Sequence, residues 1–253
     1  MNHPYDPNEL NDPNDPNDPN EHNKLNKLSY FMNASDKKLL ITIDGPAGAG
    51  KTTVSRLLAD RLGYRYIDTG ALYRGVALAV KTRGVNPEND ADIASLCRRL
   101  KLSFTIDNRG LRLISDGQDV TDRIRSPEIT MLASAVSAKP VVRQYLLELQ
   151  RNLGREKAAV FEGRDMGTVV FPEADVKFFL DASTKTRALR RFEELKFKTA
   201  QSLDEVERDM KQRDQNDSTR QAAPLKPAPD AIIIDSTGLS AVQVVEVMLS
   251  HIE

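Results

Sequence analysis

The fold of this chain is indicated most directly by one stretch, Gly45-Pro46-Ala47-Gly48-Ala49-Gly50-Lys51-Thr52. It matches the pattern G-x-x-x-x-G-K-[ST], which is typical of a loop whose backbone N–H groups surround phosphate oxygens. The apolar residues 38–44 come before it and predict a short buried strand of a parallel sheet. Residues 51–62 follow it with apolar side chains at helical spacing, and Gly63 is a suitable C-terminal cap. A strand, a glycine-rich loop and a helix in this order predict a site for a nucleoside triphosphate.

The loop carries specific chemical expectations. Its glycines allow N–H groups to point inward, and the N-terminus of the following helix adds partial positive charge. Lys51 is expected to reach the β- and γ-phosphates of ATP, and the hydroxyl of Thr52 to hold Mg²⁺ through ATP. ATP and Mg²⁺ are therefore the predicted cofactors. The residues predicted to bind ATP are Gly45, Pro46, Ala47, Gly48, Ala49, Gly50, Lys51, Thr52 and Thr53.

The remainder of residues 37–253 alternates between strand and helix patterns. Further strands are expected at 64–68, 158–162, 176–181 and 231–235. Helices are expected at 70–82, 127–138, 140–154, 184–197 and 202–215, and after Ser240. Buried strands separated by helices predict an α/β fold built on a doubly wound parallel sheet.

The middle of the chain differs from this alternation. Residues 102–106 and 111–114 show strand patterns around the turn Asp107-Asn108-Arg109-Gly110, and Asp116-Gly117 marks a second tight turn. These signals predict a small antiparallel sheet that is inserted into the parallel fold.

Residues 1–36 stand apart from the rest. The triplet Asn-Asp-Pro occurs three times in succession between Asn11 and Pro19. Asn, Asp and Pro favour turns and supply little apolar surface to bury. We expect residues 1–36 to be a disordered arm and residues 37–253 to form the folded domain.

The composition excludes several classes of protein. The net charge of −1 argues against a nucleic-acid partner. The single cysteine, Cys97, excludes an internal disulfide, and the three histidines lie near the chain ends, which disfavours a catalytic triad or a His-rich zinc site. No apolar run approaches the ~20 residues of a membrane span, and the N-terminus lacks the apolar core of a signal peptide. We expect a cytoplasmic monomer with no membrane partner.

Arginines gather downstream of the loop. Arg187, Arg190 and Arg191 lie on one predicted helix, and Arg213 and Arg220 follow on the next part of the chain. Such charge runs are usually solvated surface, but phosphoryl transfer also relies on cations placed around phosphate oxygens. We interpret these helices as a lid over the phosphate site.

Several segments together resemble the bacterial cytidylate kinase family. They are the loop at 45–52, Asp68-Thr69-Gly70-Ala71-Leu72-Tyr73-Arg74, Glu162-Gly163-Arg164-Asp165-Met166-Gly167-Thr168-Val169-Val170-Phe171-Pro172, and the stretch from Arg213 to Arg220. The resemblance continues through Asp181-Ala182-Ser183 and Asp235-Ser236-Thr237, and it covers residues 38–253. It implies a P-loop kinase with a small α+β monophosphate-binding insert near 85–140 and a helical lid near 184–222.

The resemblance implies one reaction and a set of residues for it. The γ-phosphoryl group of ATP would pass to CMP or dCMP, giving ADP together with CDP or dCDP. The implied catalytic residues are Lys51, Arg164, Arg187, Arg191 and Arg213. The implied substrate-binding residues are Thr69, Tyr73, Arg74, Ser134, Arg143, Arg164, Asp165, Arg213, Asp217 and Arg220. Of these, Arg213, Asp217 and Arg220 match the positions that close over the sugar and phosphates.

The resemblance also separates phosphate binding from base reading. It assigns Arg74 and Arg164 to the phosphate of CMP, and Ser134, Arg143 and Asp165 to the cytosine edge. The chemistry of cytosine fits this assignment, because an aspartate accepts from its amino group while an arginine donates to its ring nitrogen. Uracil reverses both polarities.

The sequence departs from the family pattern at three places. Glu162 stands where aspartate is also familiar, and Thr52-Thr53 replaces a Gly-Thr pair of some members. The match is looser between Phe192 and Gln201, within the expected lid.

Two other functions stay open at the level of sequence. A P-loop kinase for a sugar acid or a shikimate-like acceptor would use similar arginines, although the set of Ser134, Arg143 and Asp165 would then have no purpose. A non-enzymatic nucleotide-binding module that acts through residues 1–36 is the second alternative.

Overall fold

The computed structural model describes residues 38–107, 110–196 and 199–252. The arm that we expect at 1–36 lies outside the described residues. The compact unit that begins at Lys38 carries every element discussed below. Within the described ranges, no helix combines the length and the apolar character that crossing a membrane requires.

The centre of this unit is a five-stranded sheet in which every pairing is parallel. The strands are β1 (Leu40–Asp44), β2 (Arg65–Asp68), β6 (Ala159–Glu162), β7 (Val176–Asp181) and β8 (Ile232–Asp235). Their spatial order is β2-β6-β1-β7-β8. The predicted parallel α/β sheet is confirmed, and β1, which leads into the glycine-rich loop, is its central strand.

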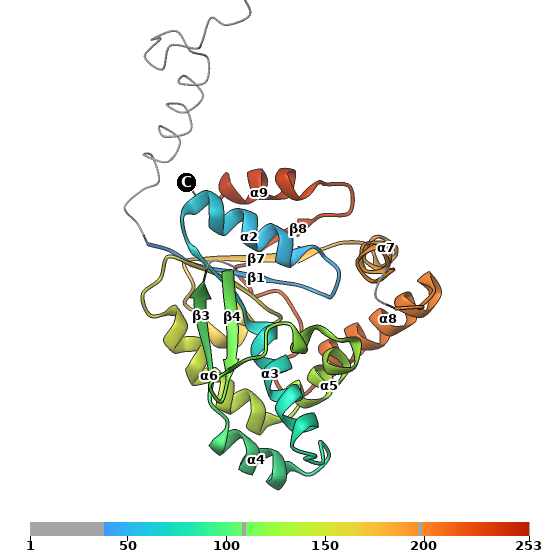
Figure 1. Ribbon diagram of the computed structural model, residues 1–253. Helices are drawn as coiled ribbons and strands as arrows, with labels where there is room; N and C mark the ends of the chain where they lie inside the picture. The colour runs from blue at the N-terminus through green and yellow to red at the C-terminus, as the bar shows by residue number, and fades with distance from the viewer. Residues whose placement is uncertain (1–37, 108–109, 197–198, 253) are drawn as a thin grey trace, which may run out of the picture. The chain divides into compact units, whose positions relative to one another are not determined.

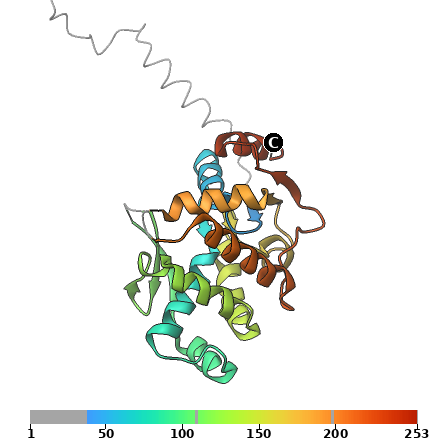
Figure 2. The same ribbon diagram turned by 90° about the vertical axis from the view of Figure 1, so that its right-hand side faces the viewer.

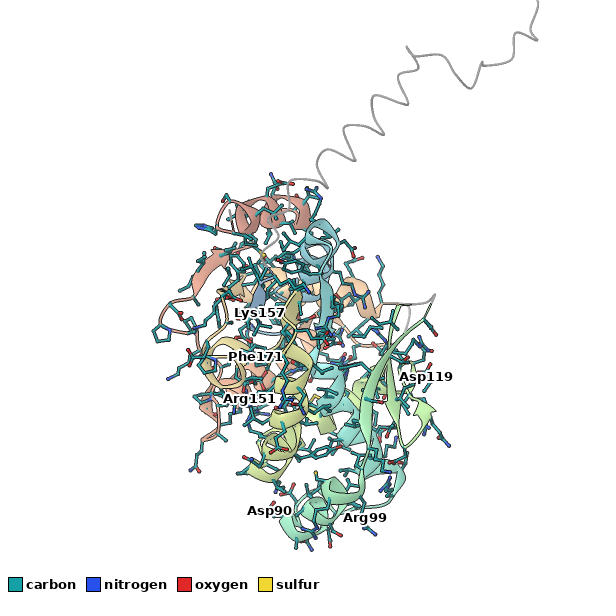
Figure 3. All side chains as sticks on the ribbon, turned by 90° about the vertical axis from the view of Figure 1, so that its left-hand side faces the viewer. Asp90, Arg99, Asp119, Arg151, Lys157 and Phe171 are labelled. Atoms are coloured by element: carbon teal, nitrogen blue, oxygen red, sulfur yellow. The ribbon has the colours of Figure 1, made fainter. Side chains whose placement is uncertain are left out.

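Helices cover both faces of the sheet (Figure 1). On one face, α2 (Lys51–Leu62) and α9 (Ala241–Leu249) pack over Ile41, Ile43 and Phe178. On the other face, α6 (Pro140–Gly154) packs with Phe161 and Phe171, whose rings meet edge to face at 4.6 Å. Figure 3 shows Arg151 of α6 near Phe171, where its Nε donates to the Val170 carbonyl over 3.1 Å.

The helix after the loop begins and ends where the sequence indicates. Gly50 precedes α2 in a left-handed conformation, and Gly63 caps its end at φ 66°. The bounds of α2 agree with the predicted helix 51–62, because apolar spacing and a C-terminal glycine both mark them. Ser240 likewise caps α9 through a capping box with Gln243, as predicted.

A second group of elements forms its own apolar cluster around Leu72, Ile93 and Leu146. It contains α3 (Thr69–Thr82), α4 (Asp90–Arg99), η1 (Arg123–Arg125), α5 (Pro127–Ser137) and α6, with the strands β3 (Leu102–Asp107), β4 (Gly110–Ser115) and β5 (Gln118–Asp119). The antiparallel pairing of β3 with β4 and of β4 with β5 confirms the predicted inserted sheet. Residues 108–109, at the first of its two turns, lie outside the described residues.

Two helices, α7 (Thr184–Leu195) and α8 (Leu203–Thr219), complete the fold. They pack against each other through Ala188, Val206 and Met210, and Figure 2 shows them side by side in orange. Figure 1 places them beyond the end of β7, next to the loop that follows β1.

Three elements differ from the sequence-based expectation. The helix α4 was not expected, because only Ile93, Leu96 and Cys97 form its buried apolar side. An N-terminal cap by Asn89 and burial against α6 stabilise this helix. The helix α8 continues beyond 215 to Thr219, since tertiary contacts of Asp217 outweigh the weak helix propensity of residues 216–219. A π-helical turn, η2 (Met166–Val170), follows β6 where no helix was expected.

Candidate active site

The carboxyl ends of the parallel strands meet at one edge of the sheet, where α/β folds usually bind ligands. Every strand of this sheet ends in an acidic residue: Asp44, Asp68, Glu162, Asp181 and Asp235. The glycine-rich loop, the segment 163–165 and the N-termini of α2, α3 and α7 all leave from this edge. The sheet therefore gathers most of the predicted site residues by topology alone.

The glycine-rich loop needs its glycines for space and for backbone conformation. A Cβ at Gly45 would stand 1.9 Å from the Leu180 carbonyl oxygen, and one at Gly48 would stand 2.8 Å from the Arg187 oxygen. Gly48 and Gly50 also have φ values of 74° and 91°, which other residues adopt at a cost. The loop is thus fixed as a tight turn against β7 and α7.

Lys51 lies at the bottom of this loop and is only 4% exposed. Its Nζ donates a 2.7 Å hydrogen bond to the Pro46 carbonyl, across the mouth of the loop. Burial, followed by the nearby guanidinium of Arg164, lowers the pKa of Lys51 well below its ordinary value. A bound polyphosphate would counter both effects, because it supplies negative charge to a buried cation.

Glu162, at the end of β6, joins several elements at this edge. Its Oε1 accepts a 2.8 Å hydrogen bond from the Thr52 hydroxyl, and its Oε2 accepts one of 2.6 Å from the Tyr66 hydroxyl. Its backbone carbonyl accepts a 2.6 Å bond from the Thr69 hydroxyl. A carboxylate and a threonine hydroxyl therefore lie side by side at the start of α2, and hard oxygen donors of this kind suit Mg²⁺.

Asp165 forms the centre of a second polar group. The side chain is 2% exposed, and its carboxylate pairs with Arg143 of α6 and lies 3.7 Å from Arg220. Burial raises the pKa of Asp165, and the two arginines offset this only in part. The guanidinium of Arg143 also lies 5.7 Å from the ring centre of Tyr73.

Asp217 of α8 gathers three arginines. Arg164 Nε donates to its Oδ2 over 3.2 Å, and Arg213 and Arg220 lie at 4.0 and 3.8 Å. Burial alone would raise the pKa of Asp217, but these three guanidinium groups lower it below the ordinary value. Asp165 and Asp217 thus connect the segment after β6 with α8.

Several buried donors near this group make no hydrogen bond within the described part of the chain, although two of them lie within ion-pair distance of a carboxylate. They are Ser134 Oγ, Arg213 Nε and Arg220 Nη2. Burial and the neighbouring Arg164 lower the pKa of Arg213 to about 10. Unsatisfied buried donors cost free energy unless a ligand completes them, and an anionic ligand with several acceptor oxygens fits this set.

Other predicted residues already have protein partners. Arg187 is buried, and its Nη1 donates to the Ala47 carbonyl over 3.0 Å and to Asp214 over 2.6 Å. Arg191 pairs with Glu194 at the helix surface over 2.8 Å. Arg74 pairs with Asp68 over 2.7 Å, at the edge of the sheet.

The geometry also brings in residues that sequence reasoning missed. Asp44 accepts hydrogen bonds from the backbone N–H groups of Met166 and Gly167 over 2.9 and 2.8 Å, so it fixes the turn that follows Asp165.

Ser236 donates to the Ala49 carbonyl over 3.1 Å and accepts from Arg190. The sequence around Asp44 and Ser236 does not predict these hydrogen bonds, because the partner residues are distant in the chain.

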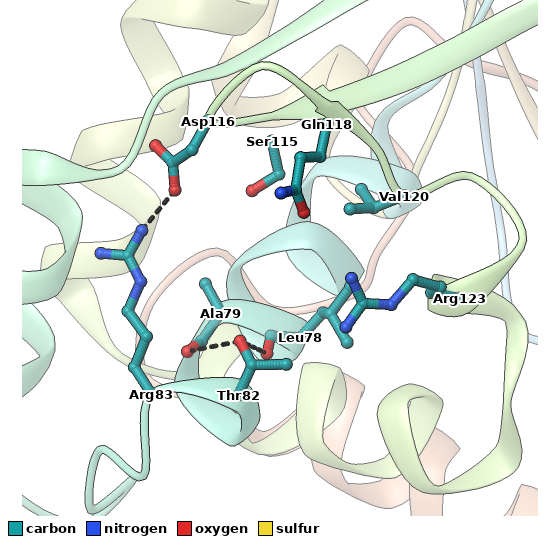
Figure 4. A pocket seen from close by; sticks show the side chains of 9 residues that line it. All are labelled: Leu78, Ala79, Thr82, Arg83, Ser115, Asp116, Gln118, Val120 and Arg123. Carbon is teal, nitrogen blue, oxygen red and sulfur yellow. Dashed lines mark hydrogen bonds and ion pairs between the residues drawn. The ribbon is translucent and has the colours of Figure 1, made fainter.

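A hollow of about 250 Å³ lies elsewhere, between α3 and the turn that joins β4 to β5 (Figure 4). Arg83 and Asp116 form an ion pair at one side of it, and Arg123 lies at the other. None of the predicted site residues lines it. The candidate site is therefore the sheet edge and not this hollow.

Comparison with known proteins gives one family. A sequence model of the family described as cytidylate kinase matches residues 41–253. The chain is 53% identical over 221 residues to the cytidylate kinase of Geobacter sulfurreducens, covering 87% of this chain and 95% of that protein. It is 47% identical over 216 residues to the cytidylate kinase of Citrifermentans bemidjiense, covering 85% of this chain and 93% of that protein.

Proposed function

Because this chain belongs to the cytidylate kinase family, we propose that the carboxyl edge of its sheet is the site where the family's reaction takes place. The enzyme transfers the γ-phosphoryl group of ATP to CMP or dCMP. One observation carries the proposed location: the glycine-rich loop with Lys51 adjoins a buried group of arginines and aspartates around Asp165 and Asp217. The first suits a triphosphate donor, and the second suits a nucleoside monophosphate acceptor.

The donor end would hold ATP on residues 45–53. The backbone N–H groups of the loop and of the first turn of α2 would bind the phosphates, and Lys51 would leave the Pro46 carbonyl to neutralise them. Among the described residues, no group of three or more His, Cys, Asp or Glu side chains forms a ready metal cage. This agrees with Mg²⁺ held by substrate phosphates together with Thr52 and Glu162, since Mg²⁺ commonly binds through one or two protein oxygens and phosphates.

The acceptor end would hold CMP between the segment 163–165, α5–α6 and α8. Asp165 would accept a hydrogen bond from the cytosine amino group, while Arg143 and Ser134 would donate to the acceptors of the ring. Buried donors of Arg213 and Arg220 make no hydrogen bond within the described residues, which supports a role for these residues on the phosphate and sugar. Bidentate arginine suits a phosphate for geometric reasons as well as for charge.

The transfer itself would be direct and in line, without a covalent enzyme intermediate. The phosphate of CMP is already anionic, so the reaction needs no general base. Lys51 and the arginines would stabilise the charge that spreads over the transferred group, and bound Mg²⁺ would supply further positive charge there. Residues 184–222 would close as a lid and exclude water, which competes as an acceptor.

Within this proposal Arg187 and Arg191 belong to the lid. Arg187 already joins α7 to the loop through the Ala47 carbonyl and to α8 through Asp214. It would hold the lid against the donor site, while Arg191 would leave Glu194 to reach the phosphates. We further propose that the working unit is a monomer and that it acts in the cytoplasm with its nucleotide substrates.

One assay tests the proposed site and substrates. Purified protein with ATP and Mg²⁺ is offered CMP, dCMP, UMP and AMP separately, and ADP release is measured. We expect fast release with CMP and dCMP and slow release with the other two. Failure to release ADP with either cytidine monophosphate would contradict the proposal.

A further inference from the structure

The carboxylate of Glu162 is held from two sides by hydroxyl groups. Thr52 donates to Oε1 over 2.8 Å, and Tyr66 donates to Oε2 over 2.6 Å. Thr52 lies where bound Mg²⁺ is expected, but Tyr66 lies behind the carboxylate, on β2. The phenol therefore fixes the glutamate from the side that faces away from the nucleotide.

The fold builds Tyr66 into this place. Register pairs Tyr66 with Val160, so Glu162 lies two residues further along β6 on the same face of the sheet. This face packs under α2, and Arg56 of that helix lies 5.2 Å from the centre of the Tyr66 ring. The Tyr66 hydroxyl lies 2.6 Å from Glu162 Oε2, and a phenol donates its proton to a carboxylate in such a bond.

We propose that Tyr66 is a positioning residue that orients the Glu162 carboxylate toward the Mg²⁺ of bound ATP. A glutamate side chain has several rotatable bonds, so its carboxylate needs a partner to fix it. A hydrogen bond at Oε2 fixes the plane of the group and leaves Oε1 directed to the side of Thr52. This inference rests on the proposed metal role of Glu162 and Thr52.

The test uses Tyr66→Phe, which keeps the ring, its packing and the Arg56 contact but removes the hydroxyl. Binding of ADP is measured by calorimetry at a series of Mg²⁺ concentrations, and binding of CMP is measured separately. We expect the Mg²⁺ concentration for half-maximal ADP binding to rise about 10-fold, the lower end of the effect of outer hydrogen-bond partners on metal affinity. Metal-free ADP binding and CMP binding should stay unchanged.

Two comparisons make the result specific. Tyr145→Phe removes a phenol that donates to the Leu100 carbonyl over 2.7 Å in the other apolar cluster, and it should leave the Mg²⁺ dependence unchanged. In a Glu162→Gln background, Tyr66→Phe should change the Mg²⁺ dependence less than about twofold, because the two residues act as one unit.

The outcomes separate this inference from the function it rests on. If wild-type protein binds ADP with no dependence on Mg²⁺, both the metal site and the role of Tyr66 are wrong. If the wild type depends on Mg²⁺ but Tyr66→Phe matches it, only the role of Tyr66 is wrong. A loss of ADP and CMP binding in equal measure, together with a lower melting temperature, would mean that the hydroxyl is merely structural and would overturn the proposal.

Discussion

At the scale of single residues, the site depends on charges that are buried before any substrate arrives. Lys51, Asp165 and Asp217 are each less than 5% exposed. Lys51 has its hydrogen-bond partner within the loop, whereas the two aspartates pair with arginines from distant parts of the chain. Burial strengthens the electrostatic interactions of such charged groups, and it raises the free-energy cost of leaving them without a partner. Substitution of any of these three residues should therefore have a large effect, and the property that changes should differ from one residue to the next.

Replacement of the loop lysine is the most direct test of the donor end. Lys51→Ala should lower kcat with CMP by about 100- to 1,000-fold, the effect of removing one group that stabilises transition-state charge. The fold should persist, because the hydrogen bond of Lys51 to the Pro46 carbonyl lies within the loop and does not join distant elements. Steady-state ADP release measures the effect, with Lys81→Ala on the surface of α3 as control. Normal turnover in Lys51→Ala would exclude the loop as the donor site.

The acceptor end can be tested through base preference. Asp165→Asn should lower the ratio of kcat/KM for CMP over UMP by about 10-fold or more, because an amide can present a donor to the uracil carbonyl. Competition assays with both nucleotides measure the ratio. If the ratio is the same in the variant and the wild type, Asp165 does not read the base.

Asp44 gives a prediction about pH. Burial raises the pKa of Asp44 to about 6 from 3.8, although the N–H groups of Gly167 and Met166 lower it. A raised pKa in the folded state means that folding takes up a proton, so this group's contribution to the free energy of unfolding falls as pH rises from about 4 to about 6 and is constant above. The range is at most about 3 kcal/mol.

Denaturant unfolding of the wild type and of Asp44→Asn between pH 4 and pH 8 isolates this contribution. The wild type should lose stability relative to the variant as the pH rises through that window. Parallel curves would show that Asp44 titrates at its ordinary value.

At the scale of elements, the helices of the lid are joined to the donor loop by Arg187. The guanidinium contacts Ala47 of the loop, Ala182 after β7 and Asp214 of α8. Sequence reasoning predicted an arginine-rich lid helix from composition. It could not show that Arg187 is buried while Arg191, one turn further along the same face, keeps a third of its side chain exposed, because spacing alone does not show how far along a helix its neighbours cover it.

The pair of Arg187 and Asp214 should therefore hold the lid in place. Asp214→Asn should lower the free energy of unfolding by about 2 kcal/mol, since it leaves a buried guanidinium without its carboxylate. Glu194→Gln removes the partner of Arg191 at the surface and should cost less than about 0.5 kcal/mol. Chemical denaturation measures both, and equal effects would refute the distinction.

At the scale of the whole molecule, the sequence predicted the parts of the fold that depend on residues close together in the chain. The parallel sheet, the loop at 45–52 and the bounds of α2 follow from apolar runs and glycines. The helix α4 and the turn η2 did not, because each depends on burial against distant elements. The residues of the site were assigned by resemblance, whereas the partners Asp44, Tyr66 and Asp214 became visible only once strand order placed them next to those residues.

The arm at 1–36 gives a prediction on the same scale. The family model matches residues 41–253, and all residues of the proposed site lie within that range. Deletion of 1–36 should therefore leave kcat and KM for CMP within about twofold of the full chain. Steady-state kinetics of both forms checks this. A marked loss of turnover would mean that the arm takes part in catalysis.

Glu162 divides its duties between side chain and main chain. Its carboxylate accepts from Thr52 on the proposed donor side, whereas its carbonyl oxygen accepts from Thr69 on the proposed acceptor side. Replacing Glu162 by any other amino acid changes or removes the carboxylate but keeps the backbone carbonyl oxygen. Replacing Glu162 by several different residues should therefore weaken binding of the nucleotide on the Thr52 side and leave binding of the other nucleotide unchanged. A residue whose side chain contacts both ligands does not allow the two effects to be separated.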